Sequence, residues 1–388
     1  MGSRDGVEEA PVLEVLEVLN QPSAVARLVP EWRELAAVAA RSPLESPDWL
    51  VPWYRHYARA VRARILAWRI GGRLVGVAPL VVSRRRRAMP VTEMGFWGGT
   101  GPALRGLVDV LALDEYRDAV LASFGTWLRS GAGPWHLFHV LRLPTESATA
   151  ERLAGWSTDA GWHHVSLTGV VRSDTFVLDL PPTVDDWRCH LGPKARHNMR
   201  TEERRFARLD GRYEIVTDPA AAGELCDALR RLLTAHWGDA EIHFRPDPAF
   251  GPFLGDAFAA MLEAGSMYTH VARDRSGLRA CLVTFVLNRR AMAVLIGVSF
   301  GGDVRRLSLG KHLFEASIAT AIELRCATYD FLWVGGYKEA FWHARPHRLE
   351  SAVVGRGFLG HAAAAYVALR RVVVPGLLLR RARGRPAS

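Results

Sequence analysis

The sequence has few cysteines and no long apolar run, and each shortage excludes a class of protein. Four cysteines occur in 388 residues, widely spaced and without a CxxC pair, so neither a disulfide framework nor a zinc site is indicated. No apolar run reaches the length of a transmembrane helix. The first ten residues, MGSRDGVEEA, have no apolar stretch of the kind found in a secretory signal. We therefore expect a soluble, cytoplasmic protein without a bound metal.

The chain is strongly basic, with a formal net charge of +10. Such a charge fits three kinds of partner, namely nucleic acid, an acidic membrane surface or an anionic ligand such as a nucleotide phosphate. It also fits an arginine-rich codon usage with no functional meaning. The length and the apolar fraction of 49% are typical of a folded protein of two domains.

A similar order of elements is predicted in both halves of the chain. In the first half, apolar runs on either side of Gly71-Gly72 predict a β-hairpin, followed by a helix near 114–130 and a strand near 135–144. In the second half, three antiparallel strands across 266–299 precede a helix at 306–325 and a strand at 328–334. The repeat predicts a fused pair of α/β domains, 1–170 and 171–360, with a helical and basic tail at 361–388.

The helix predicted at 306–325 begins with RLSLGK. A helix start presents unpaired backbone N–H groups and a partial positive charge, so it binds phosphate when it faces a cleft. Ser308 adds a hydroxyl, Gly310 admits a ligand close to the backbone, and Lys311 adds charge. The same residues also suit an ordinary helix start that Ser308 caps.

The segments after this helix start carry a resemblance to a known family. The order strand, R-R-L-S-L-G, helix, Y-D-F and G-G-Y-K-x-x-F-W resembles the CelD (cellulose-biosynthesis-type) acetyltransferases of the GNAT superfamily, which are related to the FemAB aminoacyl transferases. SPDWLVPWYRHY, LVGVAPLVVSRRRR and GPKARHNMRTEERRF agree with it, so the resemblance covers most of residues 32–345. It implies a tandem GNAT-like α/β fold of mostly antiparallel sheets, and acyl transfer from acyl-CoA, acetyl-CoA or longer, to an amine.

The resemblance also assigns the cofactor contacts. It places Ser308, Leu309 and Gly310 at the CoA pyrophosphate and pairs one strand with the pantetheine arm. The remaining residues that it implies near CoA are Ile296, Gly297, Val298, Arg305, Arg306 and Lys311. Leu309 stands where the family often has proline, and Gly335-Gly336 where it often has a glycine and an acid. The second departure removes an acidic side chain from the substrate site.

Acyl transfer needs a base for the amine and a donor for the thioester oxygen. Lys338 is the candidate donor, because a lysine at this place in FemAB-like proteins points into the site; a surface ion pair is its alternative role. Tyr337 either protonates the leaving thiolate or packs in the core. Asp330 is a candidate base, or orients Lys338, or is a structural carboxylate at a strand end. His236 and Glu241, in the titratable cluster HWGDAEIHF, are further candidate bases.

Arginines recur at helical spacing across 194–208 and so share one face of a helix. This pattern indicates either an anionic partner or a solvated helix face. They leave open transfer from charged tRNA, as in FemAB relatives, although no long coiled-coil insertion is present. A non-catalytic protein that binds an anionic lipid or nucleic acid also remains open, as does a peripheral membrane contact of the arginines at 84–87. The acceptor amine, whether small molecule, saccharide or peptide, is not specified by the sequence.

Overall fold

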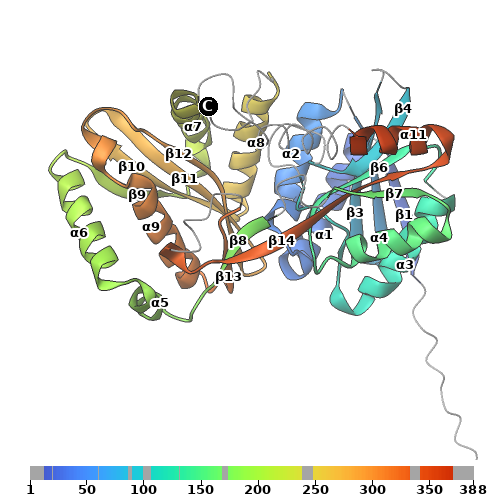
Figure 1. Ribbon diagram of the computed structural model, residues 1–388, viewed down its shortest axis with the longest axis horizontal. Helices are drawn as coiled ribbons and strands as arrows, with labels where there is room; N and C mark the ends of the chain where they lie inside the picture. The colour runs from blue at the N-terminus through green and yellow to red at the C-terminus, as the bar shows by residue number, and fades with distance from the viewer. Residues whose placement is uncertain are drawn as a thin grey trace, which may run out of the picture.

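The computed structural model describes residues 13–19, 21–59, 61–85, 90–98, 106–130, 132–167, 174–237, 248–332 and 341–369. Within these residues, fourteen strands form one continuous sheet in the order β1-β2-β3-β4-β6-β14-β8-β13-β12-β11-β10-β9, with β5 beside β3 and β7 beside β14. Figure 1 shows two lobes, each with helices packed on its part of the sheet, joined by the long strand β14.

The first lobe consists mostly of the N-terminal half of the chain. Its strands are β1 (Glu14–Leu19), β2 (Arg62–Ile70), β3 (Arg73–Arg85), β4 (Val91–Phe96), β5 (Leu111–Ala112), β6 (Leu137–Pro144) and β7 (His163–Ser166). Its helices are α1 (Pro22–Ala39), η1 (Pro43–Glu45), α2 (Pro47–Tyr57), η2 (Asp114–Tyr116), α3 (Arg117–Ser130) and α4 (Ala148–Asp159).

The second lobe has the same kind of elements. Its strands are β8 (Asp174–Asp179), β9 (Arg212–Val216), β10 (Met267–Asp274), β11 (Gly277–Leu287), β12 (Arg290–Val298) and β13 (Thr328–Asp330). Its helices are α5 (Val184–His190), α6 (Pro193–Ala207), η3 (Pro219–Ala221), α7 (Ala222–Trp237), α8 (Phe250–Glu263), η4 (Gly302–Arg306) and α9 (Leu309–Glu323). The chain ends with β14 (Arg345–Gly355) and α11 (Gly357–Ala368).

The repeated order of elements is confirmed. In the first half, β2, β3 and β4 are antiparallel, and α3 then leads to β6, which lies parallel to β4. In the second half, β10, β11 and β12 are antiparallel, and α9 leads to β13, which lies parallel to β12. Each half thus contains three antiparallel strands, a crossover helix and one parallel strand.

The last strand connects the two lobes. The first part of β14 pairs with β8, from Arg345 opposite Val177 to Arg348 opposite Asp174. From Leu349 onward β14 pairs with β6, and α11 packs on β14 and β7 of the first lobe. The division into 1–170, 171–360 and 361–388 remains a prediction, and the structure adds that residues 349–369 complete the N-terminal lobe.

Local sequence explains where several elements turn. Gly71 and Gly72 both have positive φ, at 55° and 79°, as the two-residue turn between β2 and β3 requires. Helices α5 and α6 are separated at Gly192-Pro193, with Pro193 as the first residue of α6. The strand predicted at 328–334 is shorter than expected. β13 ends at Asp330 because its carboxylate accepts the amide of Leu332, which has a φ of 53°.

One hydrophobic core extends across both lobes. Trp49 of α2 packs edge-on against Phe253 of α8 and Phe285 of β11, with ring centroids 4.7 and 5.2 Å apart. Asn288, between β11 and β12, donates hydrogen bonds to the carbonyl oxygens of Val38 and Ala40. These contacts fix the two lobes against each other. In the described part of the chain, no helix combines the length and the apolar character needed to cross a bilayer.

Candidate functional site

The two parallel strands of the second lobe separate just beyond a short paired segment. β12 and β13 pair only from Arg290 opposite Thr328 to Met292 opposite Asp330. Beyond Met292, β12 pairs with β11 on one side and, among the described residues, with no strand on the other. An unpaired strand edge offers backbone N–H and C=O groups to an extended ligand.

Asp330 stands where these strands part. It is the last residue of β13, and its Oδ1 accepts the Leu332 amide at 2.7 Å. Burial raises the pKa of Asp330 to about 6, while the Leu332 amide and the charge of His347 act in the opposite direction. A carboxylate with a pKa near 6 remains ionised at neutral pH and is basic enough to accept a proton during catalysis.

Asp330 also lines a cavity of about 440 Å³ between the lobes. Residues 38–43 and Glu146 form its wall on the first lobe, and β8, β12, β13 and β14 contribute its wall on the second. His347 of β14 contacts Glu146 across the two lobes, with 2.8 Å between Nε2 and Oε2. A volume of this size accommodates a small organic ligand.

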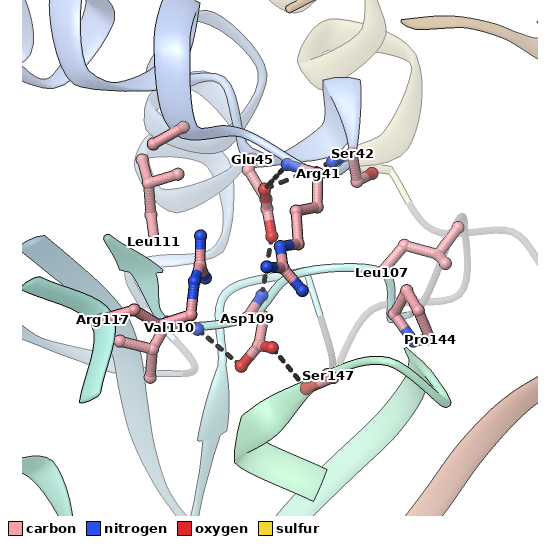
Figure 2. A pocket seen from close by; sticks show the side chains of 11 residues that line it. Arg41, Ser42, Glu45, Leu107, Asp109, Val110, Leu111, Arg117, Pro144 and Ser147 are labelled. Carbon is pink, nitrogen blue, oxygen red and sulfur yellow. Dashed lines mark hydrogen bonds between the residues drawn. The ribbon is translucent and has the colours of Figure 1, made fainter. Parts of the chain in front are cut away.

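A second, smaller pocket in the first lobe shares Arg41 and Ser42 with this cavity and contains two acidic residues (Figure 2). Glu45 is 4% exposed, and its carboxylate accepts the backbone amides of Arg41, Ser42 and Asp109. Burial, followed by the nearby Asp109 carboxylate, raises the pKa of Glu45 to about 7. Asp109 in turn binds the hydroxyl of Ser147. These bonds fix the backbone that carries Arg41 at the cavity.

The start of α9 is already in contact with an acidic side chain. Glu202 of α6 accepts hydrogen bonds from the Ser308 amide at 3.2 Å and from the Ser308 hydroxyl at 3.3 Å. The buried His312 has its Nε2 3.5 Å from the same carboxylate. The amides of Leu309 and Gly310 have no acceptor within the described chain. The helix start therefore attracts a carboxylate, as it would attract a phosphate.

The other residues predicted at this helix start take different positions. Leu309 is fully buried in the core under α9, its backbone included. A Cβ added at Gly310 would meet Ile296 and Val298 at 3.5 Å, an ordinary contact, so the glycine is not required for packing. Lys311 lies over the ring of Phe341, with Nζ 4.7 Å from the centroid.

The strand predicted to face pantetheine is adjacent to this helix start. Ile296 and Val298 are half-buried near the end of β12, beyond the part of the strand that pairs with β13. Gly297 has a packing role, because a Cβ there would come within 2.9 Å of Leu232 in α7. The structure therefore brings Ile296, Val298 and Gly310 together.

The remaining predicted residues are placed only in part. Arg305 and Arg306 lie in η4 and His236 lies in α7, while their side chains are outside the described part of the structure. Tyr337, Lys338 and Glu241 lie outside the described residues. Their assigned roles stay predictions. The described residues contain no group of three potential metal ligands.

Three contributors to the site were not predicted from the sequence as site residues. These residues are Glu202, Arg41 and His347. Arg41 and His347 are separated by about three hundred positions, and only the packing of the lobes brings them to one cavity. No local motif marks either residue, whereas Asp330 stood out because it follows a strand within a family motif.

Comparison with known proteins agrees with this architecture. Residues 193–343 match a family model described as an acetyltransferase (GNAT) domain. The crystal structure of FemX is similar at a TM-score of 0.60 and 12% identity, over 87% of this chain and 96% of that chain. The C-terminal domain of a putative lysylphosphatidylglycerol synthetase from Agrobacterium fabrum is similar at 0.50 and 14%, over 89% and 97%. A search of curated proteins found no match.

The matched segment contains α6, β12, α9 and β13 of the candidate site, whereas β8 and β14 of the cavity wall lie outside it. The predicted fold is confirmed: the chain has a tandem GNAT fold of mixed, mostly antiparallel strands flanked by helices. It contains a GNAT acetyltransferase domain and is an acyltransferase.

Proposed function

We propose that this protein transfers an acyl group, in the simplest case acetyl, from acyl-CoA to a primary amine by direct attack. One observation carries the proposal: Asp330, with a pKa near 6, lies where β12 and β13 separate and lines the cavity between the lobes. The sequence leads us to expect a cytoplasmic protein, and the cytoplasm supplies acyl-CoA. Membership of the CelD-type branch is part of the proposal.

The donor enters along β12 in this proposal. Its pantetheine amides pair with the free edge of β12 near Ile296 and Val298, and its diphosphate binds the start of α9. Ser308, Leu309 and Gly310 supply backbone amides, and Lys311, Arg305 and Arg306 supply positive charge. The half-buried end of β12 and its proximity to Gly310 support this path.

The acceptor enters from the cavity on the side of Asp330. Asp330 removes a proton from the amine, whose own pKa falls as it leaves water. The nitrogen then attacks the thioester carbonyl, the new C–N bond forms, and the C–S bond breaks. Lys338 is proposed as the donor to the carbonyl oxygen, and Tyr337 as the donor of the proton that the thiolate takes. Free CoA thiol and the amide are the products.

Glu202 must leave the helix start when the diphosphate arrives, because two anions cannot share the same amides. This requirement favours a second candidate, in which the donor is an aminoacyl-tRNA and the diphosphate site is not used. Exposed arginines on α6 beside Glu202 suit a polyanion. The third alternative is a protein that binds an anionic ligand without turnover.

Transfer assays with separate donors distinguish these functions. The purified protein is given a mixture of primary amines with acetyl-CoA, with longer acyl-CoAs or with aminoacyl-tRNA, and release of CoA thiol or tRNA is followed. The proposal predicts thiol release that depends on the amine and is lost in Asp330→Asn. Turnover with aminoacyl-tRNA alone would establish the second candidate. If a ligand binds but no donor gives turnover, the third alternative, a non-catalytic binding protein, is supported.

A further inference from the structure

The polar groups of the cavity between the lobes are mostly paired with one another. Arg345 donates to Asp179, His347 contacts Glu146, and Arg41 donates to the Glu146 carbonyl oxygen. The carboxylate of Asp114 is bound by Arg117 at 2.7 Å. Arg290 has no ion pair among the described residues, and Asp330 has none with a cation at contact distance.

The two unmatched charges lie on the same face of adjacent strands. Arg290 is opposite Thr328 and Met292 is opposite Asp330 in the β12–β13 pairing. One strand spacing and two residues separate Arg290 from Asp330, about 8 Å between their Cα atoms in regular sheet geometry. Both side chains line the cavity. A cation and an anion are thus presented to the same ligand at neighbouring positions.

We infer that the acceptor is an amine that also carries a carboxylate, such as an amino acid, with its amine at Asp330 and its carboxylate at Arg290. The inference rests on the proposed function for the role of Asp330, and it names the acceptor class. A charge-assisted bond to a guanidinium is among the stronger polar contacts in a protein. An amine without an acid leaves Arg290 unmatched, whereas a zwitterion satisfies both charges. Arg41, on the opposite wall, is already engaged, because its guanidinium lies 3.7 Å from the Asp114 carboxylate.

Matched pairs of amines test this inference directly. L-Lysine and 1,5-diaminopentane differ only by the carboxylate, as do L-alanine and ethylamine. Each is titrated into the full-length protein without donor, and binding is measured by calorimetry. We expect the carboxylated member of at least one pair to bind about tenfold more tightly than its partner. Arg290→Gln should reduce this preference to less than about twofold, and Arg290→Lys should retain part of it.

Arg289→Gln is the control, because Arg289 is exposed, donates to the Arg325 carbonyl oxygen and does not line the cavity. Equal binding within both pairs, no binding of any amino acid at millimolar concentration, or an undiminished preference in Arg290→Gln would overturn the inference. Its failure is separable from that of the proposed function. Acyl transfer to amines regardless of a carboxylate would leave the function standing, and amino acid binding without acyl transfer would leave the acceptor class standing.

Discussion

In each lobe, two parallel strands pair over three residues and then part to form a wedge. Large aromatic side chains follow the paired residues in the first lobe and smaller aliphatic ones in the second, so we call the first wedge closed and the second, over the described residues, open. In the first lobe, β4 and β6 pair over three residues, and Phe96 and Trp97 then close the gap at 4% and 0% exposure. Trp97 donates to the Leu80 carbonyl oxygen and stacks on Tyr54. In the second lobe, β12 and β13 also pair over three residues. The next two residues, Ala293 and Val294, are buried but small, and Ile296 and Val298 further along β12 are half-buried.

The helices that follow the two wedges, α3 and α9, differ in the charge at their starts. α3 begins after Asp114 and Glu115 and has Asp118 in its first turn, whereas α9 begins with Leu309, Gly310 and Lys311. Acids at a helix start repel an anionic ligand. The repeated fold therefore provides two possible donor sites, and in our proposal only the second receives the donor. The predictions below test this asymmetry, beginning with the largest effect.

Removing the carboxylate at the open wedge should have the largest effect. Asp330→Asn retains an oxygen for the Leu332 amide but cannot accept the amine proton, so we expect kcat to fall about 10²- to 10³-fold. Because only the carboxylate form of Asp330 acts as a base, wild-type kcat/KM should rise with pH through about 6 and then level off. Steady-state assays from pH 5 to 8 measure both effects.

His139 occupies the matching place in the closed wedge, opposite Gly95, and provides the control. His139→Asn should change kcat less than about twofold in protein that remains folded. An Asp330→Asn enzyme with wild-type kcat, or a profile without a bend near pH 6, would contradict the role assigned to Asp330.

Blocking the helix start should have the next largest effect. A Cβ at Gly310 fits beside Ile296, so Gly310→Ala should leave KM for acyl-CoA nearly unchanged. Gly310→Trp covers the free amides, and we expect KM to rise at least about tenfold. Asp118 is the second residue of α3, as Gly310 is of α9, and Asp118→Trp should have no effect on KM. Similar KM values in all three variants would argue against a donor site at α9.

Removing the charge of Glu202 should produce a smaller change in the opposite direction. Glu202→Gln retains an oxygen for the Ser308 amide but no longer competes as an anion, so we expect acyl-CoA to bind about fivefold more tightly. Glu203→Gln, a change of the exposed neighbour, should leave the affinity unchanged. Binding of CoA measured by calorimetry provides the comparison, and weaker binding to Glu202→Gln would show that Glu202 assists the donor.

The buried acid Glu45 of the first lobe should affect the stability of the protein rather than its catalytic rate. Burial holds the pKa of Glu45 in the folded protein at about 7, above its ordinary value of 4.5. Its contribution is fully present below the unfolded pKa and is lost as pH rises through 7, on the order of 3 kcal/mol. Chemical unfolding between pH 4.5 and 8 should show this decline, and Glu45→Gln should flatten it. A wild-type stability that rises across this range would contradict the assignment.

The sequence predicted the repeated elements because hydrophobic periodicity and turn residues such as Gly71 and Gly72 act locally. It also identified Asp330 and the α9 start, because both lie within contiguous motifs. It did not predict the sharing of β14 between the lobes, since pairing over such distances leaves no local pattern. The contacts of Glu202 with Ser308 and of His347 with Glu146 have the same cause, because each depends on tertiary packing.

The stoichiometry of CoA binding tests the asymmetry of the lobes most directly. Calorimetric titration of CoA into the wild-type protein should give one site per chain. The same titration should give no detectable binding to Gly310→Trp and unchanged binding to Asp118→Trp. Two sites per chain, or equal binding by the wild type and Gly310→Trp, would contradict the proposal that the open wedge of the second lobe alone receives the donor.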